Sequence, residues 1–405
     1  MEGGYVELFE NRDWELTAPG KYFVVRNGSA LMAFHLPKGE IRGYMLYAAH
    51  SDSPCLKLKE EPEQKAAEYY TRLRVEKYGG MICSTWLDRP LSLAGRIVVQ
   101  TPDGVASRLV HIDRDLLLIP SVAIHMERNV NDGKAFNPNV DMLPLYASAE
   151  PKTSLRSLIA REAGVEEADI LATDLYVYSR TPAALWGGDG EFLSAPRLDD
   201  LQCAFAGLEG LIAAQPKDSA AVLCIFDNEE VGSGTKQGAD SNFLEQVLYR
   251  ISASLGKRPE AHMALLSNSF MVSADNGHAV HPNHPEFADG GDRPRMNGGV
   301  VIKWNAAQRY TTDAMSAGIF ADLCKRAGVP VQRYTNRPDL PGGGTLGNIS
   351  NAHVSIPTVD VGLAQLAMHS AYETCGAEDA GHMIRAAQAL FSSSLEQEGD
   401  SVFIR

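Results

Sequence analysis

The sequence predicts an α/β fold in which helices cover both faces of a sheet and a β-rich second domain interrupts the first. Three observations lead to this prediction. Apolar runs of strand length alternate with helical patterns from about residue 190 onward. Short β-like runs separated by turns fill residues 76–180. Strand patterns also precede this region, so we expect one domain at residues 1–75 and 185–405 and a β-rich domain at residues 76–184.

The segment before the insertion alternates short strands with turns. Strands are expected over residues 22–25, 30–34 and 44–49, where apolar residues lie between turn-forming residues. The last of these strands leads directly into His50 and Asp52.

The β-rich region differs in texture, because its apolar runs are short and polar, Pro or Gly turns separate them. Strands are expected over residues 96–100, 108–112, 116–119 and 175–178, with one helix over residues 155–162.

The last part of the chain returns to alternating helices and strands. Helices are expected over residues 201–214, 243–255, 312–327 and 370–395. Strands are expected over residues 220–226, within 262–272, and over 354–361. This alternation implies a sheet that is covered on both faces.

Composition excludes several classes of partner. The chain has 405 residues, enough for two domains, and a formal net charge of −14. This charge disfavours nucleic acids and anionic membranes, and no apolar run approaches the length of a membrane span. The six cysteines form no Cys-Xaa-Xaa-Cys pair, and the N-terminus lacks a signal-peptide pattern. We therefore expect a cytoplasmic protein with reduced thiols.

Two adjacent carboxylates, Glu229 and Glu230, follow the apolar run over residues 220–226. A buried strand at this place would deliver both side chains to its C-terminal edge, which is where ligands bind in open α/β sheets. Adjacent glutamates in a cleft repel each other unless a cation lies nearby. The pair therefore indicates a metal site.

Ligand-type residues occur in five segments beside predicted strands or helices. One alone would be weak, because a strand-end Asp often caps a helix and a lone His is usually a satisfied polar group. Together, two imidazoles and three carboxylates suit a pair of zinc-like ions that share one carboxylate. The segments contain His50 and Asp52, Asp199 and Asp200, Glu229 and Glu230, Asp275, and His369 at the expected start of the last helix.

The chain resembles the aspartyl aminopeptidases, the family-18 co-catalytic metallopeptidases. The resemblance extends over nearly the whole chain. Beyond the five segments it includes residues 19–27, 78–80, 85–91, 119–131, 303–310 and 342–347. It implies a mixed sheet of the zinc-peptidase type with helices on both faces, and a β-rich domain that serves dimerisation and oligomerisation.

The resemblance also implies a role for each residue of the metal constellation. His50 would bind one metal ion and His369 the other, with Asp199 as the bridge. Glu230 and Asp275 would each complete the shell of one ion. Two divalent ions are expected, with zinc as the first choice, although such ligands also accept cobalt or manganese.

Glu229 would stay off the metals and act as the general base. Two ions would lower the pKa of a water and polarise the scissile carbonyl of a peptide. The free N-terminus of the peptide would bind at the second metal, which predicts an exopeptidase. Asp52 is expected to orient the His50 imidazole, and its alternative role is a turn cap.

Four further residues are expected to contact substrate. His125 matches a histidine that reaches a neighbouring subunit's active site, although a surface or core histidine is the alternative. Lys303 would meet an acidic substrate side chain, or would be a solvated strand-end lysine. Gly343 and Thr345 lie in a glycine-rich segment without the spacing of a phosphate loop, so a tight turn near the substrate is expected.

The predicted function is therefore removal of N-terminal residues, with Asp and Glu as the expected class, by a homo-oligomer of dimers assembling into a dodecamer. Two alternatives stay open: a catalytically silent peptide-binding or assembly scaffold, and a carboxypeptidase or deacylase on the same fold. One departure from the family pattern is Asp200, where relatives more often have Asn. An added negative charge there would change metal preference or affinity.

Overall fold

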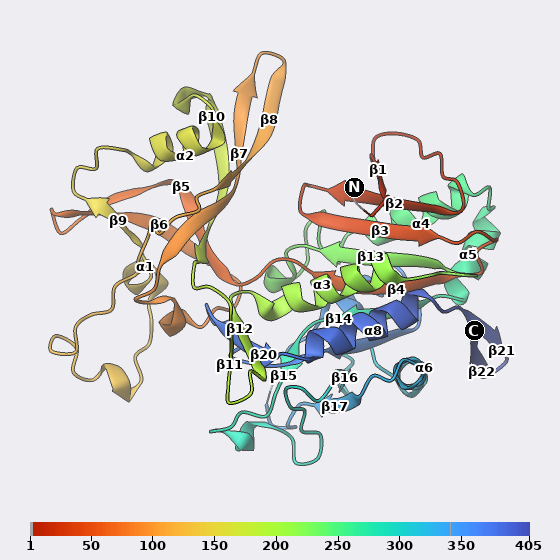
Figure 1. The fold of residues 1–405 in the computed structure, drawn as a ribbon. Helices are drawn as coiled ribbons and strands as arrows, with labels where there is room; N and C mark the ends of the chain where they lie inside the picture. Colours follow the sequence, from red (N-terminus) through yellow and green to blue (C-terminus); the bar gives the residue numbers. More distant parts are fainter. Residues whose placement is uncertain (1–2, 341) are drawn as a thin grey trace.

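The computed structural model describes residues 3–340 and 342–405. Figure 1 shows two lobes, of which the larger carries β1 (Val6–Leu8) and β22 (Ser401–Ile404) near the two ends of the chain. The smaller lobe is mostly β-structure. None of the described helices is both long enough and apolar enough to cross a membrane.

A mixed sheet forms the centre of the larger lobe, with the strand order β1-β2-β3-β13-β4-β14-β18-β16-β17. Strands β13, β4, β14 and β18 are parallel neighbours, so their C-terminal ends meet at one edge of the sheet. After β1, the strands are β2 (Gly20–Arg26), β3 (Ala30–Leu36), β4 (Tyr44–His50), β13 (Ala220–Phe226), β14 (Phe270–Ala274), β16 (Val300–Trp304), β17 (Val331–Thr335) and β18 (Thr358–Gly362).

Helices cover both faces of this sheet, as the sequence predicts. Every residue of β4 is buried: Met45 and Tyr47 face one apolar core, and Tyr44 and Leu46 face the other. Alternation of this kind, with both sets apolar, is typical of a strand that is covered on two sides. One core includes α3 (Leu198–Ala213), α6 (Ala314–Arg326) and α8 (Asp379–Phe391), and the other includes α4 (Phe243–Ser254), α5 (Pro259–Ser267) and α7 (Leu346–Ser350).

The smaller lobe has its own sheet, with the order β8-β7-β10-β5-β6-β9, and its own apolar core. The domain boundary expected at residue 75 falls inside β6, and β5 also belongs to this sheet, so sheet membership moves the boundary to about residue 54. The elements are β5 (Cys55–Ala66), β6 (Tyr70–Tyr78), β7 (Leu91–Thr101), β8 (Gly104–His111), β9 (Leu145–Ser148), β10 (Ile170–Ser179), α1 (Pro138–Asp141) and α2 (Leu155–Ala163).

A small sheet with the order β11-β12-β20-β19-β15 lies beside α3 and α8 in the larger lobe (Figure 1). Its strands are β11 (Ala184–Trp186), β12 (Phe192–Ala195), β15 (Gly277–His278), β19 (Ala364–Leu366) and β20 (Glu373–Gly376), and β21 (Leu395–Glu398) forms a separate hairpin with β22. Short 3₁₀ turns span Cys83–Trp86, Val130–Asp132, Glu167–Asp169, Glu229–Val231 and Pro285–Phe287.

Several sequence predictions need correction. The helix expected over residues 370–395 is confined to α8, because Glu373–Gly376 pairs with β12 and β19 as β20. Residues 116–119 form only isolated bridges at Leu117 and Leu118 rather than a strand. The strand expected within residues 262–272 is present and begins at Phe270, after α5. The strand expected over residues 354–361 begins only at Thr358, after Pro357.

Candidate metal centre

Neighbouring parallel strands bring ligand-type side chains to one edge of the central sheet. His50 is the last residue of β4 and lies opposite Phe226, the last residue of β13. Glu229 and Glu230 follow β13 in a 3₁₀ turn, and Asp275 follows β14 directly. The edge predicted from the apolar run is therefore the place where these groups converge.

Asp199 and His369 reach the same edge from other elements. Asp199 stands at the start of α3 with non-helical backbone angles, and His369 has a positive φ of 67° in the loop between β19 and β20. His369 therefore does not begin a helix, contrary to the sequence prediction. The carboxylate of Glu373 fixes both segments: Oε2 accepts the N–H of Asp199 at 3.0 Å and Oε1 accepts the N–H of His369 at 2.7 Å.

The two imidazoles lie on opposite sides of Asp199. His50 Nε2 is 3.7 Å from Asp199 Oδ1 and 3.8 Å from Asp275 Oδ1. His369 Nε2 is 3.2 Å from Asp199 Oδ2 and 3.4 Å from Glu230 Oε1. Two sets of possible ligands share Asp199: one adds His50 and Asp275, and the other adds Glu230 and His369. Within each set, one ligand atom from each residue lies within 4.8 Å of the others. A single carboxylate thus faces two sets of nitrogen and oxygen donors.

Several oxygens of this cluster are buried without a hydrogen-bond partner among the described residues: Asp199 Oδ1, Asp200 Oδ1 and Glu230 Oε1. A buried charged oxygen without a partner is costly unless a cation coordinates it. Imidazole and carboxylate donors suit zinc and other borderline divalent ions. The residues present therefore fit a metal site.

The electrostatics of the cluster show the same need for positive charge. Burial, with Asp275 nearby, raises the pKa of Glu229 to about 7, and burial raises the pKa of Glu230 to about 9. Although burial opposes its protonation, Asp199 and Glu230 raise the pKa of His369 to about 9. Protons thus compensate the crowded carboxylates where no metal is bound.

Each imidazole is oriented through its second nitrogen. His50 Nδ1 lies 3.1 Å from the carbonyl oxygen of Asp52 and 3.3 Å from its Oδ1. His369 Nδ1 lies 3.0 Å from the carbonyl oxygen of Gly80. If Nδ1 donates in both rings, Nε2 is left free to bind a metal. Asp52 thus lies beside the His50 imidazole, and its orienting role stays a prediction.

Asp52 also holds the segment that carries the two glutamates. Its Oδ1 accepts the N–H of Glu229 and its Oδ2 accepts the N–H of Glu230, both at 3.1 Å. The Tyr78 hydroxyl donates to Oδ2 at 2.6 Å. Sequence reasoning did not assign roles to Tyr78 or Glu373. The only sequence signal for Glu373 is an acidic residue four positions after His369.

Lys303 lies beside Asp275 rather than at the surface. Its side chain is 2% exposed, Nζ donates to the carbonyl oxygen of Asn276 at 2.8 Å, and Nζ is 3.7 Å from Asp275 Oδ2. Although burial opposes ionisation, Lys303 and His50 hold the pKa of Asp275 well below its usual range. Lys303 is therefore not the solvated lysine of the alternative interpretation.

Three expected substrate contacts are not brought into the metal cluster of this chain. Thr345 is buried, and its hydroxyl donates to Asp360 Oδ1. Gly343 is in the loop before α7, where the space a Cβ would occupy is open. His125 is exposed in the smaller lobe, within a turn after Ser121.

Comparisons with known proteins agree with this geometry. The family model described as Aminopeptidase I zinc metalloprotease (M18) matches residues 1–391. The chain belongs to the M18 family. An M18 protein from Clostridium acetobutylicum, described as a probable M18 family aminopeptidase 2, is 44% identical over 94% of this chain and 89% of its own length. Another of the same description, from Stutzerimonas stutzeri, is 40% identical over 96% of this chain and 92% of its own.

Solved M18 structures share the fold. A structure of the Ape4 and Nbr1 complex matches with a TM-score of 0.92 at 36% identity, covering 96% of this chain and 80% of that one. The crystal structure of prApe1 matches with a TM-score of 0.90 at 30% identity, covering 96% of this chain and 88% of that one. The structure of a yeast mApe1 dodecamer matches with a TM-score of 0.85 at 29% identity, covering 96% of this chain and 90% of that one. The chain is thus an M18 metalloaminopeptidase, a hydrolase that acts as an exopeptidase.

Proposed function

We propose that the protein removes N-terminal residues from peptides by two-metal hydrolysis. The observation that carries this proposal is the position of Asp199, whose two oxygens face the two separate imidazoles of His50 and His369. His50 and Asp275 would hold one ion, and His369 and Glu230 the other, with Asp199 shared. Zinc is the first choice, and cobalt and manganese also accept these ligands.

Two divalent ions in this site would supply an acidified water and a polarised carbonyl. The chain itself supplies the proton acceptor. Glu229 Oε2 is 4.0 Å from His50 Nε2, and the backbone N–H of Glu229 is held by Asp52. From there the Glu229 carboxylate would take a proton from water and return it to the leaving amine.

The decisive experiment pairs two isosteric substitutions at neighbouring positions. Glu229→Gln is expected to keep two metals per chain, measured by elemental analysis, and to lose about 10²- to 10⁴-fold in turnover, the range for a general base. Glu230→Gln is expected to lose metal. Turnover that survives Glu229→Gln in the fully loaded protein would show that another group is the base.

We also propose the expected preference for N-terminal Asp or Glu. The support is Lys303, a buried cation beside Asp275 that has donated one of its three N–H groups to Asn276. Lys303→Met is expected to lower kcat/KM for aspartyl substrates more than for alanyl substrates. An equal loss for both would mean that Lys303 acts only on Asp275.

Assembly is part of the proposal. The yeast mApe1 structure is a dodecamer, which supports dimers of this chain assembling in the same way, through the smaller lobe. His125 would then reach a neighbouring copy's metal centre. Mixing His125→Ala chains with Glu229→Gln chains would restore activity if the sites are shared, and would leave it absent if they are not.

The proposed location is the cytoplasm. In the described residues all six cysteines are free thiols, which suits a reducing compartment.

A further inference from the structure

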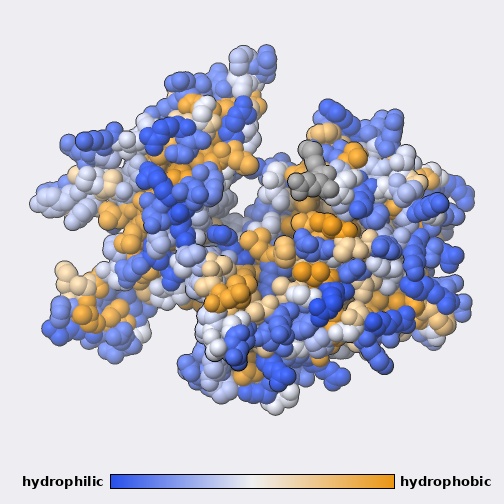
Figure 2. All heavy atoms as spheres, viewed as in Figure 1, coloured by the Kyte–Doolittle hydropathy of each residue, from blue (hydrophilic) through white to orange (hydrophobic). Residues whose placement is uncertain are grey.

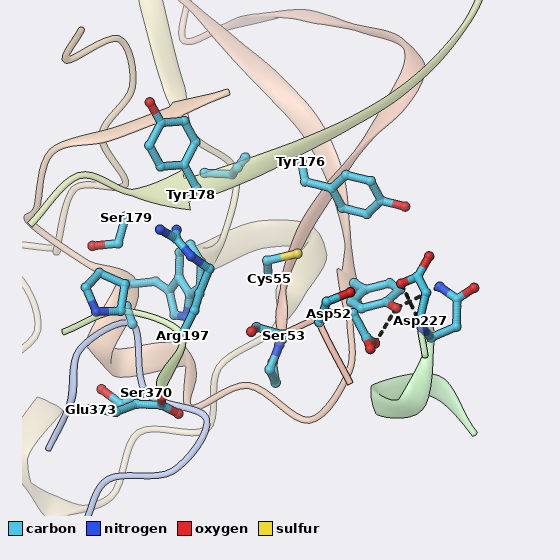
Figure 3. Close-up of a pocket in the computed structure, with 18 of the residues that line it drawn as sticks. Asp52, Ser53, Cys55, Tyr176, Tyr178, Ser179, Arg197, Asp227, Ser370 and Glu373 are labelled. Atoms are coloured by element: carbon cyan, nitrogen blue, oxygen red, sulfur yellow. Dashed lines mark hydrogen bonds between the residues drawn. The ribbon is translucent and has the colours of Figure 1, made fainter. Parts of the chain in front are cut away.

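A cavity of about 360 Å³ lies at the junction of the two lobes (Figure 3). Residues 51–55 after β4, the end of β6 and the end of β10 form one part of its wall. The turn before α3 and the loop before β20 form another. The proposed metal ligands and Glu229 do not line this cavity in the described parts of the chain. It is therefore separate from the space in which the ligand atoms converge.

The exposed guanidinium of Arg197 lines the cavity, with the Glu373 carboxyl as an acidic neighbour. No hydrogen bond or ion pair joins the guanidinium of Arg197 to any residue within 3–340 or 342–405. The guanidinium carbon lies 5.8 Å from the centroid of the Tyr178 ring (Figure 3). A ring face leaves the N–H donors of the guanidinium free. A carboxylate is the group that fits these donors best, since it accepts two of them at once.

The rest of the wall combines apolar and acidic groups. Trp86, Tyr176 and the neutral thiol of Cys55 give it an apolar body, because burial raises the pKa of Cys55 to about 12. Glu373 also lines the cavity. Burial, with Asp199 nearby, raises the pKa of its carboxyl to about 7, so it carries negative charge above that pH. The guanidinium of Arg197, the carboxylate of Glu373 and the apolar wall together match a small zwitterion with an apolar side chain.

The wall residues connect directly to the metal centre. Glu373 accepts the N–H groups of Asp199 and His369. Asp52 accepts those of Glu229 and Glu230. A molecule that contacts Glu373 or Asp52 in the cavity is therefore separated from the proposed metal ligands by that one residue.

We propose that this cavity binds a free α-amino acid with an apolar side chain, with its carboxylate on Arg197 and its ammonium group facing Glu373. Every aminopeptidase releases free α-amino acids, but an apolar one is not the preferred product of an enzyme that favours N-terminal Asp or Glu. Its role as an inhibitor rests on the proposed aminopeptidase function. An ammonium group beside Glu373 competes for the oxygens that hold Asp199 and His369. Binding therefore loosens the metal ligands, and by reciprocity metal loading weakens amino-acid binding.

Calorimetry with three probes tests the recognition chemistry. L-phenylalanine carries both charges, 3-phenylpropionate lacks the amine, and phenethylamine lacks the carboxylate. Metal-free protein removes any contribution of bound ions at the catalytic centre. Phenylalanine is expected to bind at least about tenfold more tightly than either analogue, a difference of about 1.4 kcal/mol. Equal binding of all three probes would overturn the proposal.

Two variants locate the site, and one serves as a matched control. Arg197→Gln removes the cation, and Cys55→Phe fills the cavity while Arg197 remains; both are expected to abolish phenylalanine binding. Arg326→Gln is the control, because Arg326 pairs with Asp322 on α6 and neither residue lines the cavity. Circular dichroism checks that each variant is folded. Unchanged binding in a folded Cys55→Phe protein would overturn the location.

Kinetics separate this proposal from the proposed function. In metal-loaded wild type, phenylalanine is expected to lower kcat without a matching rise in KM, and Arg197→Gln is expected to remove this effect. Purely competitive inhibition would place phenylalanine at the catalytic metals and overturn the inference. Phenylalanine binding without any aminopeptidase turnover would overturn the proposed function alone, and turnover without binding would overturn the inference alone.

Discussion

The carboxylate of Glu373 accepts the backbone N–H of His369 at 2.7 Å, and with its other oxygen it accepts the N–H of Asp199. One side chain thus holds the backbone of both the proposed bridging carboxylate and an imidazole that is far from it in the sequence. Because His369 lies with a positive φ outside any helix or strand, its position depends on side-chain support as well as on the turn that joins Ser370 to Ala367. Glu373 provides that support.

Glu373→Gln keeps one acceptor oxygen and turns the other into a donor. One of the two backbone N–H groups then loses its partner, so the affinity for metal is expected to fall by about 10- to 100-fold. Competition with a chelator of known affinity measures this. Glu378→Gln, an exposed change near the start of α8, is the control and should leave the affinity unchanged.

Neighbouring aspartates at the start of α3 are expected to respond differently to the same substitution. Burial, with Asp275 nearby, raises the pKa of Asp200 well above its usual value, which favours the neutral acid, a group that resembles an amide in shape and charge. Asp200→Asn should change the free energy of unfolding by less than about 1 kcal/mol and retain activity. Asp199→Asn should lose bound metal. A large activity loss in Asp200→Asn would show that Asp200 is ionised in the active protein.

Metal removal is expected to destabilise the protein. Buried carboxylates repel one another without cations, and any ion that binds only the folded state stabilises it, by about 4 kcal/mol at a thousandfold excess over its Kd. Thermal unfolding with chelator, and again after zinc addition, measures the difference. Glu230→Gln should reduce the stabilisation by zinc, because it removes a ligand.

The pH dependence of stability should invert when metal is bound. Glu229 and Glu230 have folded-state pKa values of about 7 and 9 against 4.5 when unperturbed, so the folded metal-free state binds more protons between pH 4.5 and 9. His369, at about 9 against 6.5, acts in the same direction. Stability of the metal-free protein therefore falls as pH rises through this window.

Metal-loaded protein should behave in the opposite way, because its ligands must lose protons to bind metal, which becomes easier at higher pH. Unfolding in denaturant at pH 6 and pH 9, with and without zinc, tests both directions. A metal-free protein that is more stable at pH 9 than at pH 6 would contradict the assigned shifts.

Strand β13 shows what a local sequence pattern can predict. Its apolar run predicts a strand over residues 220–226, which matches the observed bounds, and the two glutamates follow at the expected edge. A short apolar run between turns has few alternatives once it must be buried on both faces. The same logic placed His50 at the end of β4.

Residues 370–395 show where local pattern fails. Their composition favours a helix, but Glu373–Gly376 pairs with β12, almost two hundred residues earlier in the chain. Such pairing depends on a partner strand that the local sequence does not contain. Glu373 was missed for the same reason, since its partners at Asp199 and His369 become neighbours only in the folded chain.

By itself, the sequence determined which residue types are available for metal chemistry and which strand ends would carry them, because strand period and strand-end polarity are local properties. The tertiary structure decided which groups face one another: Asp199 between two imidazoles, Asp52 under both glutamates, and Lys303 against Asp275 instead of solvent. These contacts depend on packing between segments that are distant in the chain. Only the folded backbone fixes their separations to within the few ångströms that coordination and hydrogen bonding require.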